Sequence, residues 1–217
     1  MKSSMWLLAA VCVIGAAAQP VAAQGGASGA PAANPAGQRA GGQPAAARGP
    51  ASGSPVVVFE TVKGAFEVEL YPNEAPKSVE HILALVKRNF YNGLRVHRLV
   101  SGFVVQFGDP QTRDMTKRPL WGNGGSGREI GALEISPKRP HRLGAVALAR
   151  EAARPGSSDS QIYIALAGLD SPQIANINGK YTVIGQVISG MDVVQKLQVP
   201  DVIRRATVRG PAAASKP

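Results

Sequence analysis

Cysteine is almost missing from this chain, because Cys12 is the only one among 217 residues. It lies in an apolar N-terminal segment that we expect to be removed on export. A mature chain without cysteine has no disulfide, no thiol and no cysteine-ligated metal, so its stability must come from packing. A lipid anchor at Cys12 is not favoured, because Val11 precedes it where such sites carry a small residue.

The sequence also lacks the patterns of three common catalytic sites. The histidines His81, His97 and His141 have no ligand spacing and no neighbouring carboxylate cluster, so we expect no metal and no other cofactor. The stretch WGNGGSGRE (121–129) is not followed by Gly-Lys-Ser/Thr, which argues against a phosphate-binding loop and favours a flexible rim. The serines of GSSDS (156–160) lack the strand–turn–helix context of a nucleophile elbow, so a hydrolase is not expected.

No long hydrophobic run is present, and the longest begins near the N-terminus. Residues 1–23 open with Lys2, continue through an apolar block from Met5 to Ala18, and end in small residues. The block is shorter than the roughly 20 residues that a spanning helix needs, so it favours a cleaved secretory signal over a membrane anchor. We expect cleavage after Ala23, with Ala18 as the second choice, and a periplasmic mature protein if the chain is bacterial.

Residues 24–54 lack both acidic and large apolar side chains, and Arg39 and Arg48 are their only charges. Such a composition cannot offset the entropy cost of ordering the backbone, so it predicts a disordered spacer. We therefore expect a folded domain over residues 55–210 and a flexible tail over 211–217. The spacer would provide reach from a membrane or wall.

Basic residues outnumber acidic ones, with a net charge of +10 for the whole chain. Residues 55–210 carry 20 basic and 14 acidic side chains, which is a net charge of +6. Nucleic acid is not the expected partner, because the signal directs the protein away from it and the basic residues alternate with acidic ones. Weak contact of a monomer with an anionic envelope surface is the milder expectation.

Short β-rich runs separated by turn signals follow from Pro55 onward. AFEVELY (65–71), for example, alternates apolar and charged residues, as a strand with one wet face does. Eight runs of this kind are expected to be strands: 55–62, 65–71, 95–100, 103–107, 144–150, 160–166, 181–188 and 202–208.

Only two segments have the apolar spacing of a helix. The first begins after Pro76, repeats its apolar residues up to Phe90 and ends at Asn92-Gly93, and the second covers residues 190–197. Many short strands with two helices to cover open ends favour a closed antiparallel barrel over a sandwich. The long connections 109–129 and 167–180 are candidate functional loops.

Six segments in a fixed order resemble the cyclophilins, a family of peptidyl-prolyl cis–trans isomerases. They are APKSVEHILALV with NFYNG, VHRLVSGFVVQFGD, WGNGGSG, GAVALAR, SDSQIYIAL, and NGKYTVIGQVISGMDVV. The resemblance extends from about Val56 to Val208. It implies a mainly β fold, a closed eight-stranded antiparallel barrel capped by two α-helices, and an enzyme that acts on proline-containing polypeptides without a cofactor.

The resemblance also implies the site residues. Arg98 would be the catalytic arginine and Gln106 the glutamine that hydrogen-bonds the substrate backbone. Substrate would lie against Phe103, Val104, Ala149, Arg150, Tyr163, Ile177 and Tyr181. Rotation about an Xaa–Pro bond has a barrier of about 18–20 kcal/mol and needs no nucleophile. An apolar grip on proline and a donor to the imide nitrogen are enough, and a guanidinium is always charged and rigidly forked.

Spacing alone does not bring these residues together. If Ser101-Gly102 were a two-residue hairpin loop, Arg98 would pair with Val105 and Gln106 would point to the opposite face. A bulge or looser turn near Gly102 is therefore required.

Several residues depart from the family pattern. Phe107 stands where glycine is usual and is expected to narrow the site, and Ile162-Tyr163 replaces the usual pair of phenylalanines. Asn176 falls near a position where many members have tryptophan, and LDSPQIANINGK (169–180) is longer than usual. We expect an active isomerase of altered efficiency with weak binding of cyclic-peptide inhibitors. The alternatives are a peptide-binding scaffold or holdase with little turnover, and an envelope adaptor that works through its basic surface or spacer.

Overall fold

The computed structural model describes residues 53–209. The expected signal peptide (1–23), all but the last two residues of the expected spacer (24–54) and the tail (211–217) lie outside this range. Within residues 53–209, no helix has the length and apolarity needed to cross a bilayer.

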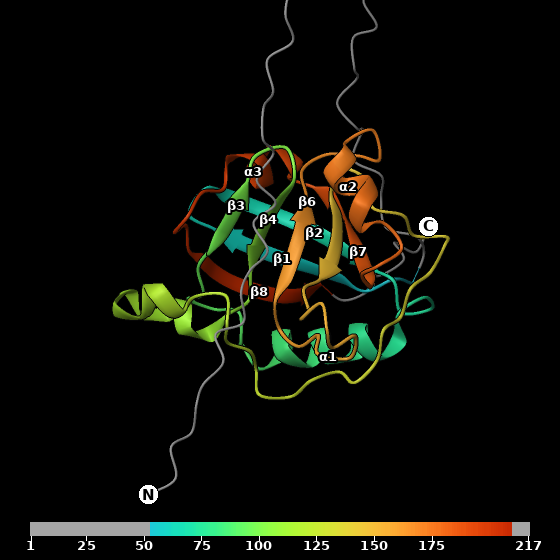
Figure 1. Ribbon diagram of the computed structural model, residues 1–217. Coiled ribbons are helices and arrows are strands. Elements are labelled where there is room, and N and C mark those ends of the chain that lie inside the picture. The colour runs from blue at the N-terminus through green and yellow to red at the C-terminus, as the bar shows by residue number, and fades with distance from the viewer. Residues whose placement is uncertain (1–52, 210–217) are drawn as a thin grey trace, which may run out of the picture. The chain divides into compact units, whose positions relative to one another are not determined.

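Eight strands form one antiparallel sheet, each within or close to one of the β-rich runs predicted from the sequence. Their bounds are β1 Val56–Thr61, β2 Gly64–Leu70, β3 Arg98–Val100, β4 Val104–Phe107, β5 Ala145–Leu148, β6 Ile162–Ala165, β7 Val183–Ser189 and β8 Ile203–Arg209. The strand order is β3-β4-β6-β5-β7-β2-β1-β8. The sheet curls on itself so that one face points inward (Figure 1).

The sheet is open, so the expectation of a closed barrel is wrong. The two edge strands, β3 and β8, do not pair along their length. They are linked just before each strand by one bridge, between Arg95 and Val202, and by a hydrogen bond from Val96 N to Asp201 O of 2.9 Å. Because β3 contains only three residues, it provides too little backbone to continue the ladder to β8.

Three α-helices accompany the sheet, one more than the sequence predicts. Helix α1 (Pro76–Lys87) and helix α3 (Met191–Lys196) lie at opposite ends of the curled sheet (Figure 1). Helix α1 ends five residues before the predicted Asn92, because Asn89 adopts a left-handed conformation with φ of 57°. The extra helix, α2 (Pro172–Ile177), lies in the long connection before β7. The other long connection contains two 3-10 segments, η1 (Pro110–Arg113) and η2 (Met115–Leu120).

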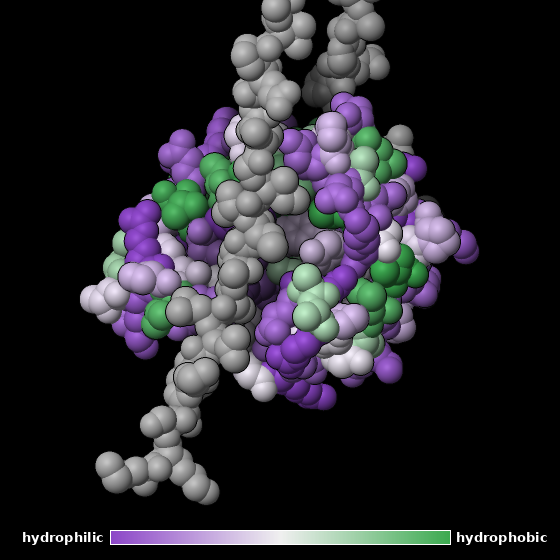
Figure 2. Space-filling model, viewed as in Figure 1, coloured by the Kyte–Doolittle hydropathy of each residue, from purple (hydrophilic) through white to green (hydrophobic). Residues whose placement is uncertain are grey.

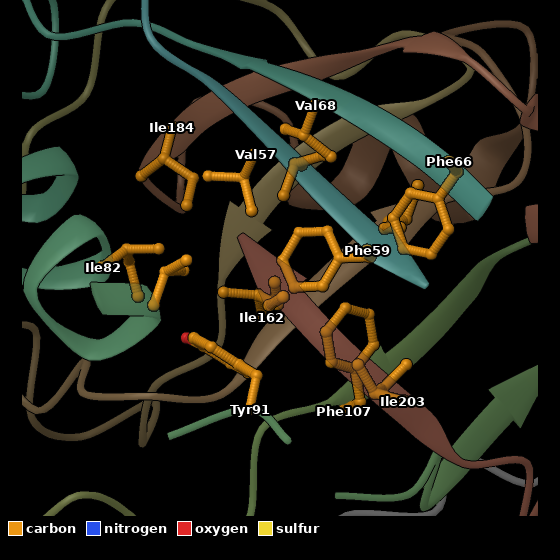
Figure 3. Packing of buried hydrophobic residues seen from close by; sticks show 14 of the residues in the cluster. Val57, Phe59, Phe66, Val68, Ile82, Tyr91, Phe107, Ile162, Ile184 and Ile203 are labelled. Carbon is orange, nitrogen blue, oxygen red and sulfur yellow. The ribbon is translucent and has the colours of Figure 1, made fainter. Parts of the chain in front are cut away.

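Large side chains fill the interior of the curled sheet. The rings of Phe59, Phe66, Tyr91 and Phe107 pack against one another, with Phe59 central and 5.1 to 5.8 Å from the other three (Figure 3). Helix α1 contributes Ile82 and its neighbours from one open end. We call this set, defined by these four rings and the aliphatic residues around them, the interior cluster.

Candidate active site

The β3–β4 hairpin sets the register on which the site depends. Three residues, Ser101 to Phe103, form its loop, with a hydrogen bond from Phe103 N to Val100 O of 3.0 Å. Gly102 has φ of +67°, a conformation that glycine adopts without a steric penalty. The extra loop residue pairs Arg98 directly with Gln106, so both side chains lie on one face. The looser turn required near Gly102 is therefore present.

A row of polar side chains runs across this face from the edge strand inward. Nη1 of Arg98 lies 3.4 Å from Oε1 of Gln106, and Nε2 of Gln106 donates to Oε1 of Gln161 at 2.8 Å. Gln161 in turn donates to the carbonyl oxygens of Gly122 and Gly124 at 2.7 and 2.8 Å. We call Arg98, Gln106 and Gln161 the polar row. Since both glutamine amides are tied, their orientation is fixed before any ligand arrives.

Gln161 was not among the residues predicted for the site. It lies beside Gln106 because β4 pairs with β6, where Gln106 is opposite Tyr163. The signal was present in the sequence, since Gln161 is two residues before Tyr163 and residues two apart in a strand share a face. A predicted pairing of these two strands would have been needed to use it.

An apolar cluster lies on the same outer face as the polar row. It includes buried Val104 and Tyr163, with Phe103, Ala149, Ile177 and Tyr181 packed around them and partly exposed. Its other members are Tyr71, Ala145, Ala147, Ala165, Ala167, Ile174 and Val183. We call this set the site cluster. The fold thus brings together all six apolar residues that the resemblance implies.

The site cluster leaves space that the interior cluster does not. Alanine occupies several of its positions on β5 and β6, so little side-chain volume covers the strands there. The space-filling view looks onto this side of the domain and shows the surface hollowed near β6 (Figure 2). The guanidinium of Arg98 lies 5.6 Å from the ring centre of Phe103, at the edge of the cluster. A charged donor therefore borders an apolar surface.

Tyr163 is anchored beneath this surface by a buried histidine. Its hydroxyl oxygen is 2.9 Å from Nε2 of His141, and the two rings are stacked with centres 6.0 Å apart. His141 is fully buried, and its backbone N–H donates to Oδ1 of Asn178, the residue after Ile177, at 3.0 Å. Burial raises the pKa of Tyr163 and lowers that of His141, so both groups are neutral near pH 7.

Arg150 braces the opposite rim with its side chain. Its guanidinium donates to the carbonyl oxygens of Glu151, Ala152 and Lys180, each at 3.0 Å, and lies 4.8 Å from the ring centre of Tyr181. The resemblance assigns only the main chain of this residue to substrate. The side chain has a separate effect, because it joins the loop after β5 to the loop before β7 and covers one face of the tyrosine.

The side chains at two departures from the family pattern do not belong to the site cluster. Phe107 is fully buried in the interior cluster, so the expectation that it narrows the site is wrong. Residues adjacent in a strand point to opposite faces, and Gln106 already points outward. Asn176 is exposed on α2, where its Oδ1 accepts from Nζ of Lys180 at 3.1 Å.

Two carboxylates hold the glycine-rich loop that was expected to be a flexible rim. Buried Asp109 accepts hydrogen bonds from the backbone N–H groups of Gly122 and Gly124. Asp159 accepts from Ser126 Oγ and from Gly127 N, and lies 3.3 Å from Nε2 of His81. Burial alone would raise the pKa of Asp159, but the hydrogen bonds from His81, Ser126 and Gly127 hold it below its usual value.

His97 lies behind the polar row, against Gly122 of this loop. Burial lowers its pKa, so the ring is neutral and adds no charge beside Arg98. Within the part of the chain that the structure describes, no group of three His, Cys, Asp or Glu side chains could hold a metal ion.

Comparison with known proteins shows the family. Residues 56–212 match the family model described as "Cyclophilin type peptidyl-prolyl cis-trans isomerase/CLD". A probable peptidyl-prolyl cis-trans isomerase of Brucella suis is 37% identical over 158 residues, covering 71% of this chain and 77% of that protein. The peptidyl-prolyl cis-trans isomerase-like 1 protein of Aspergillus fumigatus is 38% identical over 141 residues, covering 65% and 80%.

Solved structures agree with this. A cyclophilin-type peptidyl-prolyl cis-trans isomerase of Cryptosporidium parvum superposes with a TM-score of 0.62 at 25% identity, covering 72% of this chain and 98% of its own. The same protein has also been solved in the presence of the dipeptide Ala-Pro. Together with the sheet, the helices and the family match, these likenesses show that the chain belongs to the cyclophilin-type peptidyl-prolyl cis–trans isomerases.

Proposed function

We propose that residues 55–210 accelerate rotation about Xaa–Pro peptide bonds, with the proline ring against the site cluster and Arg98 as the catalytic donor. As the bond twists, amide resonance is lost and the imide nitrogen gains a localised lone pair. A guanidinium N–H placed there interacts with the twisted state and little with the planar one, so it lowers the barrier. No bond to the enzyme forms and no proton needs to leave the substrate.

The polar row is the observation that carries this proposal. Arg98 is exposed, and no carboxylate among residues 53–209 forms an ion pair with it. Its charge is therefore available to a ligand beside Phe103. Gln106, whose amide is fixed by Gln161, would hold the substrate backbone. Phe103, Tyr163 and their apolar neighbours would take the ring.

The test is the cis-to-trans rate of a short Ala-Pro peptide with residues 24–217, wild type beside Arg98→Ala. We expect the substitution to lower kcat/KM by about 10²- to 10³-fold, as loss of a transition-state donor does. Since Arg98 is exposed, the free energy of unfolding should change little. Arg204→Ala is the matched control, because Arg204 is an exposed arginine on β8, at the other edge of the sheet.

The same experiment separates the enzyme from a peptide-binding scaffold. Acceleration by the wild type that is lost in Arg98→Ala, with peptide binding retained, supports the enzyme. Peptide binding by the wild type without any acceleration would instead support the scaffold. The scaffold alternative was based on Phe107 and on the altered region 176–178. Phe107 no longer supports it, because this residue lies in the interior cluster.

We also propose that the protein is exported, with cleavage after Ala23, and assists the folding of exported proteins in the periplasm. The support is the sequence pattern of residues 1–23 and the spacer composition of residues 24–54. The mass of the mature protein recovered from the periplasmic fraction tests it, and a protein that retains Met1 in the cytoplasm would contradict it. Deleting residues 24–54 should leave peptide turnover unchanged if the protein is an isomerase. If it is instead an envelope adaptor that works through its spacer, the same deletion should abolish its function in the envelope.

A further inference from the structure

One segment stands away from the sheet beside the candidate active site. Residues 110–121, which we call the arm, contain η1 and η2 and appear as the yellow-green coil at the left of Figure 1. On η2, Met115 and Leu120 are 44% and 51% exposed although both are large and apolar. About half of the surface of each residue is left uncovered, so this part of the arm is open to a ligand.

The two ends of the arm are held together beside the polar row. Asp109 directly precedes the arm, three residues after Gln106, and its carboxylate accepts from Gln111 N at 2.8 Å and from Gly122 N at 2.6 Å. Gly122, where the arm returns, offers its carbonyl oxygen to Gln161. A peptide that lies along the polar row would therefore reach the arm on leaving the site.

The arm carries positive charge that the described part of the chain does not neutralise. Lys117 and Arg118 are exposed and form no ion pair within residues 53–209. Asp114 is the only acidic residue of the arm. Its carboxylate accepts hydrogen bonds from Thr116, at 2.9 Å from the backbone N–H and at 2.6 Å from the hydroxyl. Arg118 also lies over the Trp121 ring, 5.9 Å from its centre, so two cations without a carboxylate partner among residues 53–209 lie beside exposed apolar side chains.

A third cation, Arg113, attaches the arm to the rest of the domain. Its guanidinium donates to the carbonyl oxygens of Phe90 and Asn92 and lies over the Phe90 ring, so it attaches the arm to the turn after α1. The base of the arm is thereby fixed, while η2 with Lys117 and Arg118 remains exposed. A surface held in place loses less entropy on binding than a free loop does.

We propose that the arm extends the peptide-binding surface and selects substrates in which an acidic residue and a large apolar residue flank the Xaa–Pro bond. The inference rests on the proposed isomerase function and names its preferred substrate class. Opposite charge steers the encounter and fixes the register, while Met115 and Leu120 offer apolar contact. The preference should appear in binding and in kcat/KM, and it should weaken as salt is raised.

The test compares two peptides with the same Ala-Pro core, one flanked by Glu and Leu and the other by Gln and Ser. Exchange rates measured by NMR give kcat/KM, and titration of a labelled peptide gives Kd. We expect the wild type to prefer the acidic peptide by roughly 5- to 20-fold at low salt, as electrostatic steering by two charges allows. Lys117→Glu with Arg118→Glu should abolish this preference and leave the rate on the Gln/Ser peptide unchanged.

Lys138→Glu with Arg204→Glu is the control, because it changes the net charge equally on exposed residues outside the arm. Equal rates for the two wild-type peptides, or equal losses in the arm and control variants, would overturn the proposal. If neither peptide is isomerised, the proposed function fails, and the Kd values still decide whether the arm selects acidic segments. Binding to phosphatidylglycerol vesicles that the arm variant loses, with unchanged peptide Kd, would assign the arm to a membrane and also overturn the proposal.

Discussion

The two faces of strands β4 and β6 carry apolar clusters that are built in opposite ways. Inward-pointing residues such as Phe107, Ile162 and Ile164 are almost fully buried and belong to the interior cluster. Outward-pointing Tyr163 and Ala165 alternate with them and belong to the site cluster. One face is filled by rings in mutual contact, and the other combines alanines with three tyrosines. The comparison indicates that a binding surface arises here because small side chains on the outer face leave space that large side chains fill on the inner face.

The clusters also differ in what holds their aromatic residues. In the interior cluster each ring is fixed by other rings, as the contacts of Phe59 with Phe66, Tyr91 and Phe107 show. The Tyr91 ring there also has a polar anchor, a hydrogen bond from its hydroxyl to Ser160 O. In the site cluster Tyr163 and Tyr181 meet edge to face, and each is also held by a polar group. His141 holds Tyr163 from below, and Arg150 lies over Tyr181. Polar anchoring keeps a ring in place on a face that must stay open to a ligand.

Truncating one phenylalanine in each cluster gives the largest expected effect. Phe107→Ala should lower the free energy of unfolding by about 3–5 kcal/mol, because it leaves a cavity among packed rings. Phe103→Ala, at a partly exposed loop residue, should cost less than about 1.5 kcal/mol of stability but lower kcat/KM by more than about tenfold. Urea unfolding and peptide rates on the folded proteins measure both. A large stability loss in Phe103→Ala with normal activity would reverse the assignment of the two clusters.

Removing one hydroxyl tests the polar anchor of the site cluster. Tyr163→Phe leaves Nε2 of buried His141 without its partner, which should cost about 1–3 kcal/mol of unfolding free energy. Tyr181→Phe is the matched control, because the Tyr181 hydroxyl makes no hydrogen bond to any of the residues from 53 to 209; we expect a change within about 0.5 kcal/mol. Thermal and urea unfolding of both variants provide the measurement. Equal effects would show that the anchor contributes nothing.

The pH dependence of stability gives the smallest and most gradual effect. Burial lowers the pKa of His97 and His141, so the unfolded chain binds more protons than the folded one below the unfolded value of about 6.5. The contribution of the neutral histidines is complete above that pH and is lost as the pH falls toward their folded pKa values. The slope cannot exceed about 1.4 kcal/mol per pH unit for each histidine.

Urea midpoints measured between pH 5 and pH 7.5 test this dependence. His141→Gln should flatten the profile relative to the wild type, even if it lowers stability at every pH. An unchanged slope in this variant would mean that His141 does not provide the linked proton. The interior cluster contains no titratable histidine, so Phe107→Ala should shift the profile without changing its slope.

The sequence predicted the strands and the two covering helices because each has a local signal. Short β-rich runs between turn signals located all eight strands, and helical spacing located α1 and α3. Helix α2 and the segments η1 and η2 are no longer than six residues, as is α3, but unlike α3 they lie in largely polar connections without a clear apolar repeat. Whether β3 meets β8 depends on pairing between residues about a hundred positions apart, and no local pattern reports it.

The site was predictable where family motifs name residues, and less so where geometry decides. Arg98 and Gln106 share a face only because the hairpin loop has three residues, which spacing alone left open. The wrong prediction for Phe107 could have been avoided from the sequence, since strand alternation directs its side chain to the face of the sheet away from Gln106. His141 gave no signal, because its role depends on burial beneath Tyr163, a residue that is distant in sequence.

The bonds of Asp109 have a consequence for protein engineering. A single buried carboxylate ties together the beginning and the end of the arm, so the segment between Gln111 and Gly122 closes on itself at its root. Its length can then vary at a small entropic cost without displacing the residues behind it. This root is a natural grafting point, where a foreign recognition loop could be installed to redirect a proline isomerase to a chosen client.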